Sequence, residues 1–100
     1  MNVIAGFTLV PVSAGLSLSK YVAACVEILE TLNINFKLHA NGTNIEGSWD
    51  EVFEAIKACQ IKVHEMGVER IFTTISVGTR IDKEQKMESK VSSVQDKISR

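Results

Sequence analysis

The sequence contains few proline, glycine and aromatic residues, and its positive and negative charges nearly balance. Its 100 residues include one proline, six glycines, one tryptophan, one tyrosine and four phenylalanines. The formal net charge is −1 at pH 7, whereas nucleic-acid-binding proteins usually carry a basic face and membrane-surface proteins a basic cluster. The composition therefore argues against both partners, and the length and 45% apolar content predict one globular domain over residues 1–100.

Long hydrophobic runs are also missing. No apolar run approaches the roughly 20 residues that a membrane-spanning helix needs. The N-terminal run Val3–Val12 contains Thr8 and has no basic residue before it, so we expect a buried strand and not a signal peptide. The two cysteines, Cys25 and Cys59, lie on apolar faces of helical patterns and are expected to be reduced core thiols. A cytoplasmic location is then the default.

The residues form no catalytic constellation. The nucleophile-elbow, phosphate-loop and dinucleotide-binding patterns are absent, and no serine or threonine has an evident base beside it. The histidines, His39 and His64, have no cysteine or carboxylate at ligand spacing in the same element, which argues against a zinc site. We therefore expect neither a metal nor a cofactor.

The spacing of apolar residues predicts strands and helices in a recognisable order. Strands are expected at residues 3–12, 35–41, 43–46 and 70–77. Helices are expected from Ser17 or Ser19 to Asn33, from Ser48 to Gly67, and from about Lys86 onward. The order strand, helix, strand, strand, helix, strand predicts an α+β ferredoxin-like split βαβ sandwich (βαββαβ), with the last helix as an addition.

Local signals mark the middle of the chain. Asn41-Gly42 is a strong hairpin-turn signal, because both residues tolerate positive φ. Ser48 and Glu51 have the spacing of a capping box, in which each side chain accepts the other residue's backbone N–H. Gly67 suits the position just after a helix, and residues 78–83 are expected to form a loop after the last strand.

In the predicted fold the first two helices cover one face of the sheet and leave the other face open. Strand alternation assigns to the helix side Phe7, Leu9, Phe36, Leu38, Ile45, Ile71, Ile75 and Val77. It assigns to the open face Gly6, Thr8, Val10, Lys37, His39, Asn44, Glu46, Phe72, Thr74 and Ser76. This mixture of small hydroxyl, apolar and charged residues suits either a partner sheet or a small ligand. The last helix favours a partner and hence a homo-oligomer, because it carries an apolar stripe formed by Met87, Val91, Val94 and Ile98.

Glu46 is the strongest ligand-binding candidate on the open face. Flanked by Ile45 and Gly47, its carboxylate could accept hydrogen bonds from an amino-substituted heterocycle and share a proton with a ring nitrogen. The alternative is a structural acceptor for the N–H groups of a turn. Asn44 accompanies Glu46 on this face. Thr43 shares the parity of Ile45, so its side chain is expected to point to the helix side or to serve the turn.

Other polar and aromatic residues leave two interpretations open. His39 is a candidate for ligand contact or for an oligomer interface, whereas His64 is expected to be solvated. Trp49 is either a core or interface anchor, which we favour, or a flat wall for an aromatic ligand. The charged segment Arg80–Lys83 could bind an anion, but pairing across a subunit boundary is favoured.

Over almost its whole length the chain resembles the small thiamine-binding protein family. Beyond the element order, the resemblance rests on Val10-Pro11, Ser19-Lys20-Tyr21-Val22, Gly42-Thr43-x-x-Glu46-Gly47-x-Trp49-Asp50 and Val77-Gly78-x-Arg80-x-Asp82-Lys83. The segment from Gly42 to Gly47 is its specific part. The resemblance implies a ferredoxin-like fold and a non-enzymatic cytoplasmic protein that forms dimers or tetramers. It also implies binding of thiamine, or of its hydroxymethylpyrimidine half, near the sheet faces and subunit contacts.

The resemblance assigns ligand contact to Thr43 and Glu46, which match its motif. The aminopyrimidine of thiamine suits Glu46, and the cationic thiazolium favours an acidic or aromatic setting. Thr8, Thr74 and Ser76 could supply the remaining hydrogen bonds. Two alternatives stay open: a regulatory homo-oligomeric interaction module without a small-molecule ligand, and a small acylphosphatase-type hydrolase. The hydrolase ranks last because the first strand is not followed by a glycine-rich anion loop with an adjacent arginine.

Overall fold

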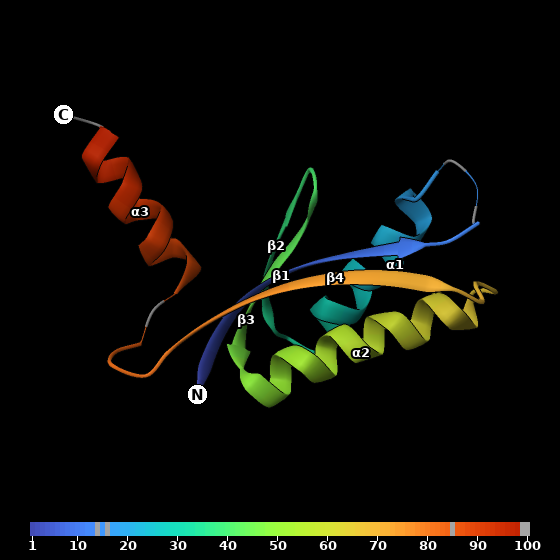
Figure 1. The fold of residues 1–100 in the computed structure, drawn as a ribbon, viewed down its shortest axis with the longest axis horizontal. Coiled ribbons are helices and arrows are strands. Elements are labelled where there is room, and N and C mark those ends of the chain that lie inside the picture. Colours follow the sequence, from blue (N-terminus) through green and yellow to red (C-terminus); the bar gives the residue numbers. More distant parts are fainter. Residues whose placement is uncertain (14, 16, 85, 99–100) are drawn as a thin grey trace.

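The computed structural model describes residues 1–13, 15, 17–84 and 86–98. This part of the chain forms a four-stranded antiparallel sheet, two helices packed on it and a third helix that extends away from it (Figure 1). The strands are β1 (Asn2–Pro11), β2 (Asn35–His39), β3 (Gly42–Ser48) and β4 (Ile71–Arg80). The helices are α1 (Ser19–Thr31), α2 (Trp49–Glu65) and α3 (Met87–Ile98). The strand order β2-β3-β1-β4 confirms the predicted α+β split βαβ fold.

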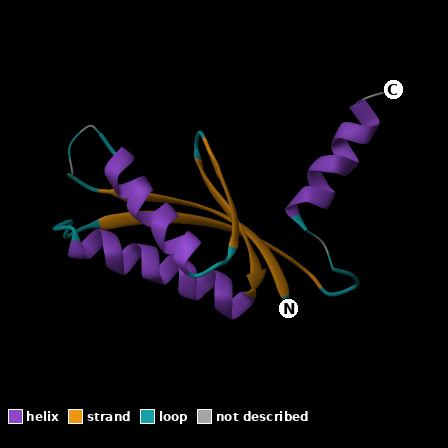
Figure 2. Ribbon diagram, turned by 180° about the vertical axis from the view of Figure 1, so that it is seen from behind, coloured by secondary structure: helices purple, strands orange, loops and turns teal. Residues whose placement is uncertain are grey.

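The hydrophobic core lies between the sheet and the two packed helices. Both α1 and α2 lie on the same face of the sheet (Figure 2). Their inward residues meet alternate residues of the strands, so Ala5, Leu29 and Ile45 are no more than 1% exposed. The register sets Ala5 between Ile45 and Val77 on this face. The division of the strand residues into two faces, predicted from alternation alone, is confirmed.

The hairpin turn between β2 and β3 lies one residue earlier than predicted. Ala40 and Asn41 form the turn, and Gly42 already pairs with His39. Gly42 is needed for close packing, since a Cβ there would lie 2.8 Å from Thr8 Oγ1 and 2.9 Å from the Phe7 carbonyl oxygen. The pairing moves by two residues relative to an Asn41-Gly42 turn, so every side chain keeps its predicted face.

Strand β4 continues through residues 78–80, which the sequence predicted as a loop. In the structure Gly78 pairs with Ile4, and Arg80 pairs with Asn2. Strand β1 offers a partner for these residues along its whole length, so the antiparallel ladder runs to its end. The extension brings Gly78 onto the open face.

The helix ends agree with the sequence in α2 and differ in α1. The capping box of α2 is confirmed: Ser48 Oγ accepts the Glu51 N–H at 3.2 Å, and Glu51 Oε1 accepts the Ser48 N–H at 3.1 Å. Gly67 follows α2 with a φ of +96°, as expected for a helix stop. The predicted serine cap of α1 is wrong. Leu18 occupies the N-cap position and makes no side-chain capping bond.

Cys25 and Cys59 are free and buried, as predicted. The Cys59 thiol donates a weak hydrogen bond to the Cys25 carbonyl oxygen, with 3.7 Å between sulfur and oxygen. A side-chain hydrogen bond with Cys25, together with burial, raises the pKa of the Cys59 thiol. Cys59 therefore stays protonated at neutral pH and acts as a small apolar residue between α1 and α2.

Candidate functional site

A cavity of about 590 Å³ lies where the open face of the sheet meets the start of α3. The register places Gly6 of β1 between Asn44 of β3 and Ser76 of β4, with Thr8 beside Thr74. These residues form the floor of what we call the open-face cavity. Helix α3 adds Met87, Lys90 and Val91. The volume falls within the range of about 300–1,000 Å³ that is typical of small-molecule sites.

Five of the residues predicted to bind a ligand line this cavity. They are Thr8, His39, Asn44, Thr74 and Ser76. The hairpin turn holds two of them in place: Thr8 Oγ1 donates to the Asn41 carbonyl oxygen at 2.8 Å, and His39 Nδ1 accepts the Asn41 N–H at 3.3 Å. The alternation of side chains on four strands thus brings together polar groups that are distant in the sequence. Their role in ligand binding stays a prediction.

Glu46 also lies on the open face, but its carboxylate is engaged within the protein. Oε2 accepts the backbone N–H of Met87 at 2.8 Å, and Oε1 accepts a hydrogen bond from Asn35 Nδ2. Glu46 is only 9% exposed. A carboxylate at a helix N-terminus is favourable, because the first N–H groups of a helix have no partner within it and carry partial positive charge. Glu46 therefore secures the start of α3, the helix that supplies one wall of the open-face cavity.

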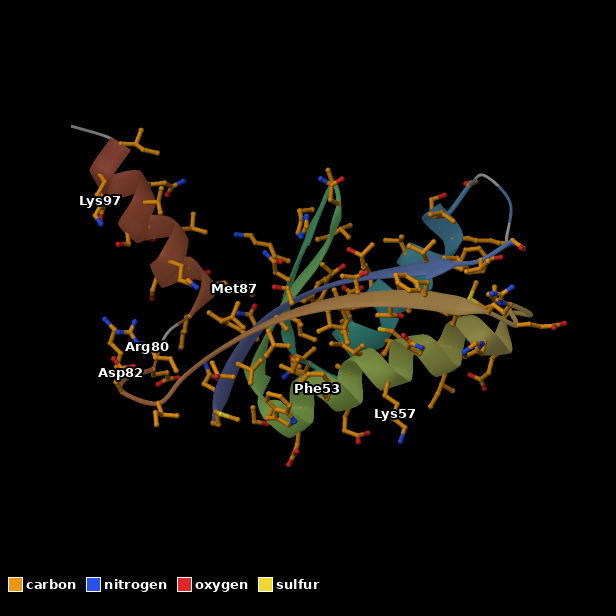
Figure 3. All side chains as sticks on the ribbon, in the orientation of Figure 1. Phe53, Lys57, Arg80, Asp82, Met87 and Lys97 are labelled. Carbon is orange, nitrogen blue, oxygen red and sulfur yellow. The ribbon has the colours of Figure 1, made fainter. Side chains whose placement is uncertain are left out.

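Two other predicted ligand residues lie away from the open-face cavity. Thr43 is 8% exposed and faces the helix side, as its parity predicted. It lines a different cavity of about 930 Å³ between α1 and the β2–β3 hairpin. Trp49 is 42% exposed at the start of α2, and its ring centroid lies 4.6 Å from that of Phe53 (Phe53 is labelled in Figure 3). The structure brings neither residue to the polar floor.

Sequence reasoning missed the contribution of α3 to the site. Met87, Lys90 and Val91 are spaced by three and four residues, which places them on the same face of the helix. Met87 and Val91 belong to the apolar stripe predicted from the sequence, but the spacing of the stripe does not show which surface it contacts. Figure 3 shows Met87 directed toward the sheet at the base of α3.

Arg80 pairs with Asp82 within its own chain, and the pairing of the Arg80–Lys83 segment across a subunit boundary stays a prediction. Its Nε lies 2.5 Å from Asp82 Oδ1, and its Nη2 lies 2.8 Å from Asp82 Oδ2 (Figure 3). The hydrogen bonds from the guanidinium lower the pKa of the Asp82 carboxyl. Both groups therefore stay ionised at neutral pH, and their charges offset each other.

The described residues show neither a metal-ligand cluster nor a membrane span. Residues 1–13, 15, 17–84 and 86–98 contain no group of three or more His, Cys, Asp or Glu side chains that could hold a metal ion. Within the same ranges no helix combines the length and the apolar character needed to cross a membrane.

Comparison with known proteins identifies the family. The sequence pattern of the thiamine-binding protein family matches residues 5–95. This chain belongs to the thiamine-binding protein family. A UPF0045 protein of Synechocystis sp. is 48% identical over 95 residues, covering 95% of this chain and 78% of the relative. The name of that relative assigns it no activity.

Solved structures share the fold of this family member. A hypothetical protein from Methanocaldococcus jannaschii matches with a TM-score of 0.86 and 29% identity, covering 95% of this chain and 97% of its own. A Thermotoga maritima protein, provisionally assigned to thiamine biosynthesis or salvage, matches with a TM-score of 0.78 and 17% identity. That match covers 94% of this chain and 99% of the Thermotoga protein, and at this identity it supports the fold alone.

Proposed function

We propose that this protein is a non-enzymatic, cytoplasmic, single-domain binding protein that holds thiamine, or its hydroxymethylpyrimidine half, in the open-face cavity. The observation that carries the proposal is the floor of the cavity. There Gly6 leaves a flat gap between Asn44 and Ser76 in the centre of the sheet. The family name and the provisional assignment of the Thermotoga protein support a thiamine-related ligand.

The groups around the cavity suit a flat aminopyrimidine. The Asn44 amide both donates and accepts hydrogen bonds, and the Thr74 and Ser76 hydroxyls can do either. An aminopyrimidine needs such a mixture, because its amino group donates and its ring nitrogens accept. Met87 and Val91 supply apolar surface for the ring faces. Recognition of this kind needs no covalent step and no nucleophile.

Filling the gap at Gly6 tests the proposal. We expect thiamine to give measurable heat on calorimetric titration of the unchanged protein, and Gly6→Leu to abolish that heat. A Cβ at Gly6 lies 3.2 Å from Asn44 Oδ1, the end of a flexible side chain, and the rest of the leucine enters the cavity. Phe72→Leu is the matched control, because Phe72 is 67% exposed on the same face and lines neither large cavity.

The proposal fails if the unchanged protein gives no heat at millimolar thiamine. It also fails if Gly6→Leu binds as well as Phe72→Leu. Far-ultraviolet circular dichroism of both variants shows whether the sheet is intact, so that lost binding is not confused with unfolding.

We also propose that the protein self-associates through α3, with a second copy covering the apolar stripe. Val91, Val94 and Ile98 are 53%, 58% and 73% exposed, and Met87 is the buried residue of this helix in the described chain. A helix of this length is marginal in water without packing, so the stripe needs a cover. This observation also favours the alternative function, an interaction module that has no small-molecule ligand.

Polar substitutions on the stripe test self-association. We expect the double variant Val94→Ser, Ile98→Ser to lower the molar mass measured by light scattering to that of the monomer. Asp96→Ser, on the polar side of the same helix, is expected to leave the mass unchanged. A monomeric unchanged protein, or a double variant that still assembles, contradicts self-association through α3. Thiamine titration of the same variants separates assembly from ligand binding.

A further inference from the structure

The charge around the open-face cavity is positive. Lys90 is the only residue with a permanent charge in the described lining, and His39 is its other titratable residue. No aspartate or glutamate is part of that lining. The nearby Glu46 carboxylate is committed to the Met87 N–H and to Asn35. A ligand whose only charge is positive would therefore be repelled by the lysine ammonium, because no free carboxylate in the described lining offsets that charge.

A small annex of about 100 Å³ adjoins the cavity at the Lys90 end. Its described lining consists of Asn2, Ile4, Gly78, Thr79, Arg80 and Lys90. Ile4, Gly78 and Lys90 line both spaces, so the annex continues the cavity along β1 and β4. Because Gly78 has no side chain, it leaves the junction between the two spaces open.

The cations at the annex are not equivalent. The charge of Arg80 is offset by its two hydrogen bonds to Asp82. No carboxylate in the described part of the chain forms an ion pair with Lys90 within 4.0 Å. Lys90 is therefore the uncompensated cation at the junction between the cavity and the annex. An unpaired lysine ammonium suits a phosphate group, which carries close to two negative charges at neutral pH.

We propose that the ligand binds as a phosphate ester, with its ring on the polar floor and its phosphate in the annex beside Lys90. This inference rests on the proposed function, and it narrows the ligand class to phosphorylated pyrimidines or to thiamine monophosphate. The phosphate offsets the thiazolium charge in the second of these ligands. A phosphoryl group is small enough for the annex, whose volume is about 100 Å³.

The test compares each parent compound with its monophosphate by calorimetric titration. The probes are hydroxymethylpyrimidine, hydroxymethylpyrimidine phosphate, thiamine and thiamine monophosphate. In the unchanged protein we expect each phosphate to bind at least about tenfold more tightly than its parent compound, because the phosphate adds a charge-assisted contact with Lys90. Lys90→Gln is expected to remove this advantage, so that each phosphate binds no more tightly than its parent measured in the same variant. Lys86→Gln, an exposed lysine that lines none of the three cavities described, is the matched control.

The outcomes separate this inference from the function on which it rests. Equal affinity for parent and phosphate overturns the phosphate site and leaves the binding function intact. If the phosphates still bind more tightly than their parents in Lys90→Gln, or if Lys86→Gln loses this difference in affinity equally, the role of Lys90 is overturned. If none of the four compounds binds, both proposals fail. An advantage that is lost only in Lys90→Gln, and that shrinks in high salt through screening, supports the inference.

Discussion

Glu46→Gln is expected to release the start of α3 and to weaken thiamine binding about tenfold or more. Glutamine keeps one carbonyl acceptor but replaces the other oxygen with an NH₂ group, so either the Met87 N–H or the Asn35 amide loses its acceptor. A hydrogen bond to a charged group contributes about 1.5–3 kcal/mol, which corresponds to roughly ten- to a hundredfold in an equilibrium constant. Met87, Lys90 and Val91 line the cavity, so loosening α3 removes one wall of the site.

Two measurements distinguish the possible roles of Glu46. If it acts by holding α3, amide hydrogen exchange over Met87–Val91 accelerates in Glu46→Gln and thiamine affinity falls with it. If it contacts the ligand directly, as the family resemblance implies, affinity falls while exchange over Met87–Val91 stays slow. Glu54→Gln, an exposed carboxylate of α2, is the matched control. Unchanged affinity together with unchanged exchange would contradict both roles.

Leu29→Ala is expected to lower the free energy of unfolding by about 2–5 kcal/mol. Leu29 is 0% exposed and packs in the core between the sheet and the two helices. Truncation removes buried apolar surface and leaves a cavity that the surrounding strands fill only partly. Small domains are stable by only about 5–15 kcal/mol, so this single change removes a large share of the total. Urea unfolding followed by circular dichroism measures the difference.

Leu32→Ala is the matched control for Leu29→Ala. Leu32 is 51% exposed at the C-terminal end of α1, so its truncation is expected to change the free energy of unfolding by less than about 1 kcal/mol. Equal losses in the two variants would contradict the packing described for the core. Thiamine affinity of folded Leu29→Ala is expected to stay near that of the unchanged protein, because Leu29 lies on the opposite side of the sheet from the open-face cavity.

Strand alternation was sufficient to divide the sheet residues between its two faces. It placed Thr8, Asn44 and Ser76 on one side and Ile45 on the other, and the register agrees. This division survived an error in the hairpin turn, because the pairing moved by two residues and faces repeat every two residues. The polar floor of the candidate site could therefore be predicted from the sequence.

The position of α3, which supplies one wall of the site, could not be predicted in the same way. The sequence showed that α3 has an apolar face, but not that Met87 meets Glu46, a residue 41 positions earlier. It also placed a loop at residues 78–80, where the long β1–β4 ladder continues. Both features depend on contacts between distant segments, which local preference and periodicity do not specify.

The sequence by itself determined the order of the elements, the two faces of the sheet and the start and end of α2. These follow from backbone sterics, side-chain period and capping, which act over a few residues. The tertiary structure alone decided the engagement of Glu46, the wall that α3 adds to the open-face cavity, and the position of Lys90, which has no carboxylate partner among the residues that the structure describes. These depend on which surfaces come together when the chain packs, and packing joins residues that share no local pattern.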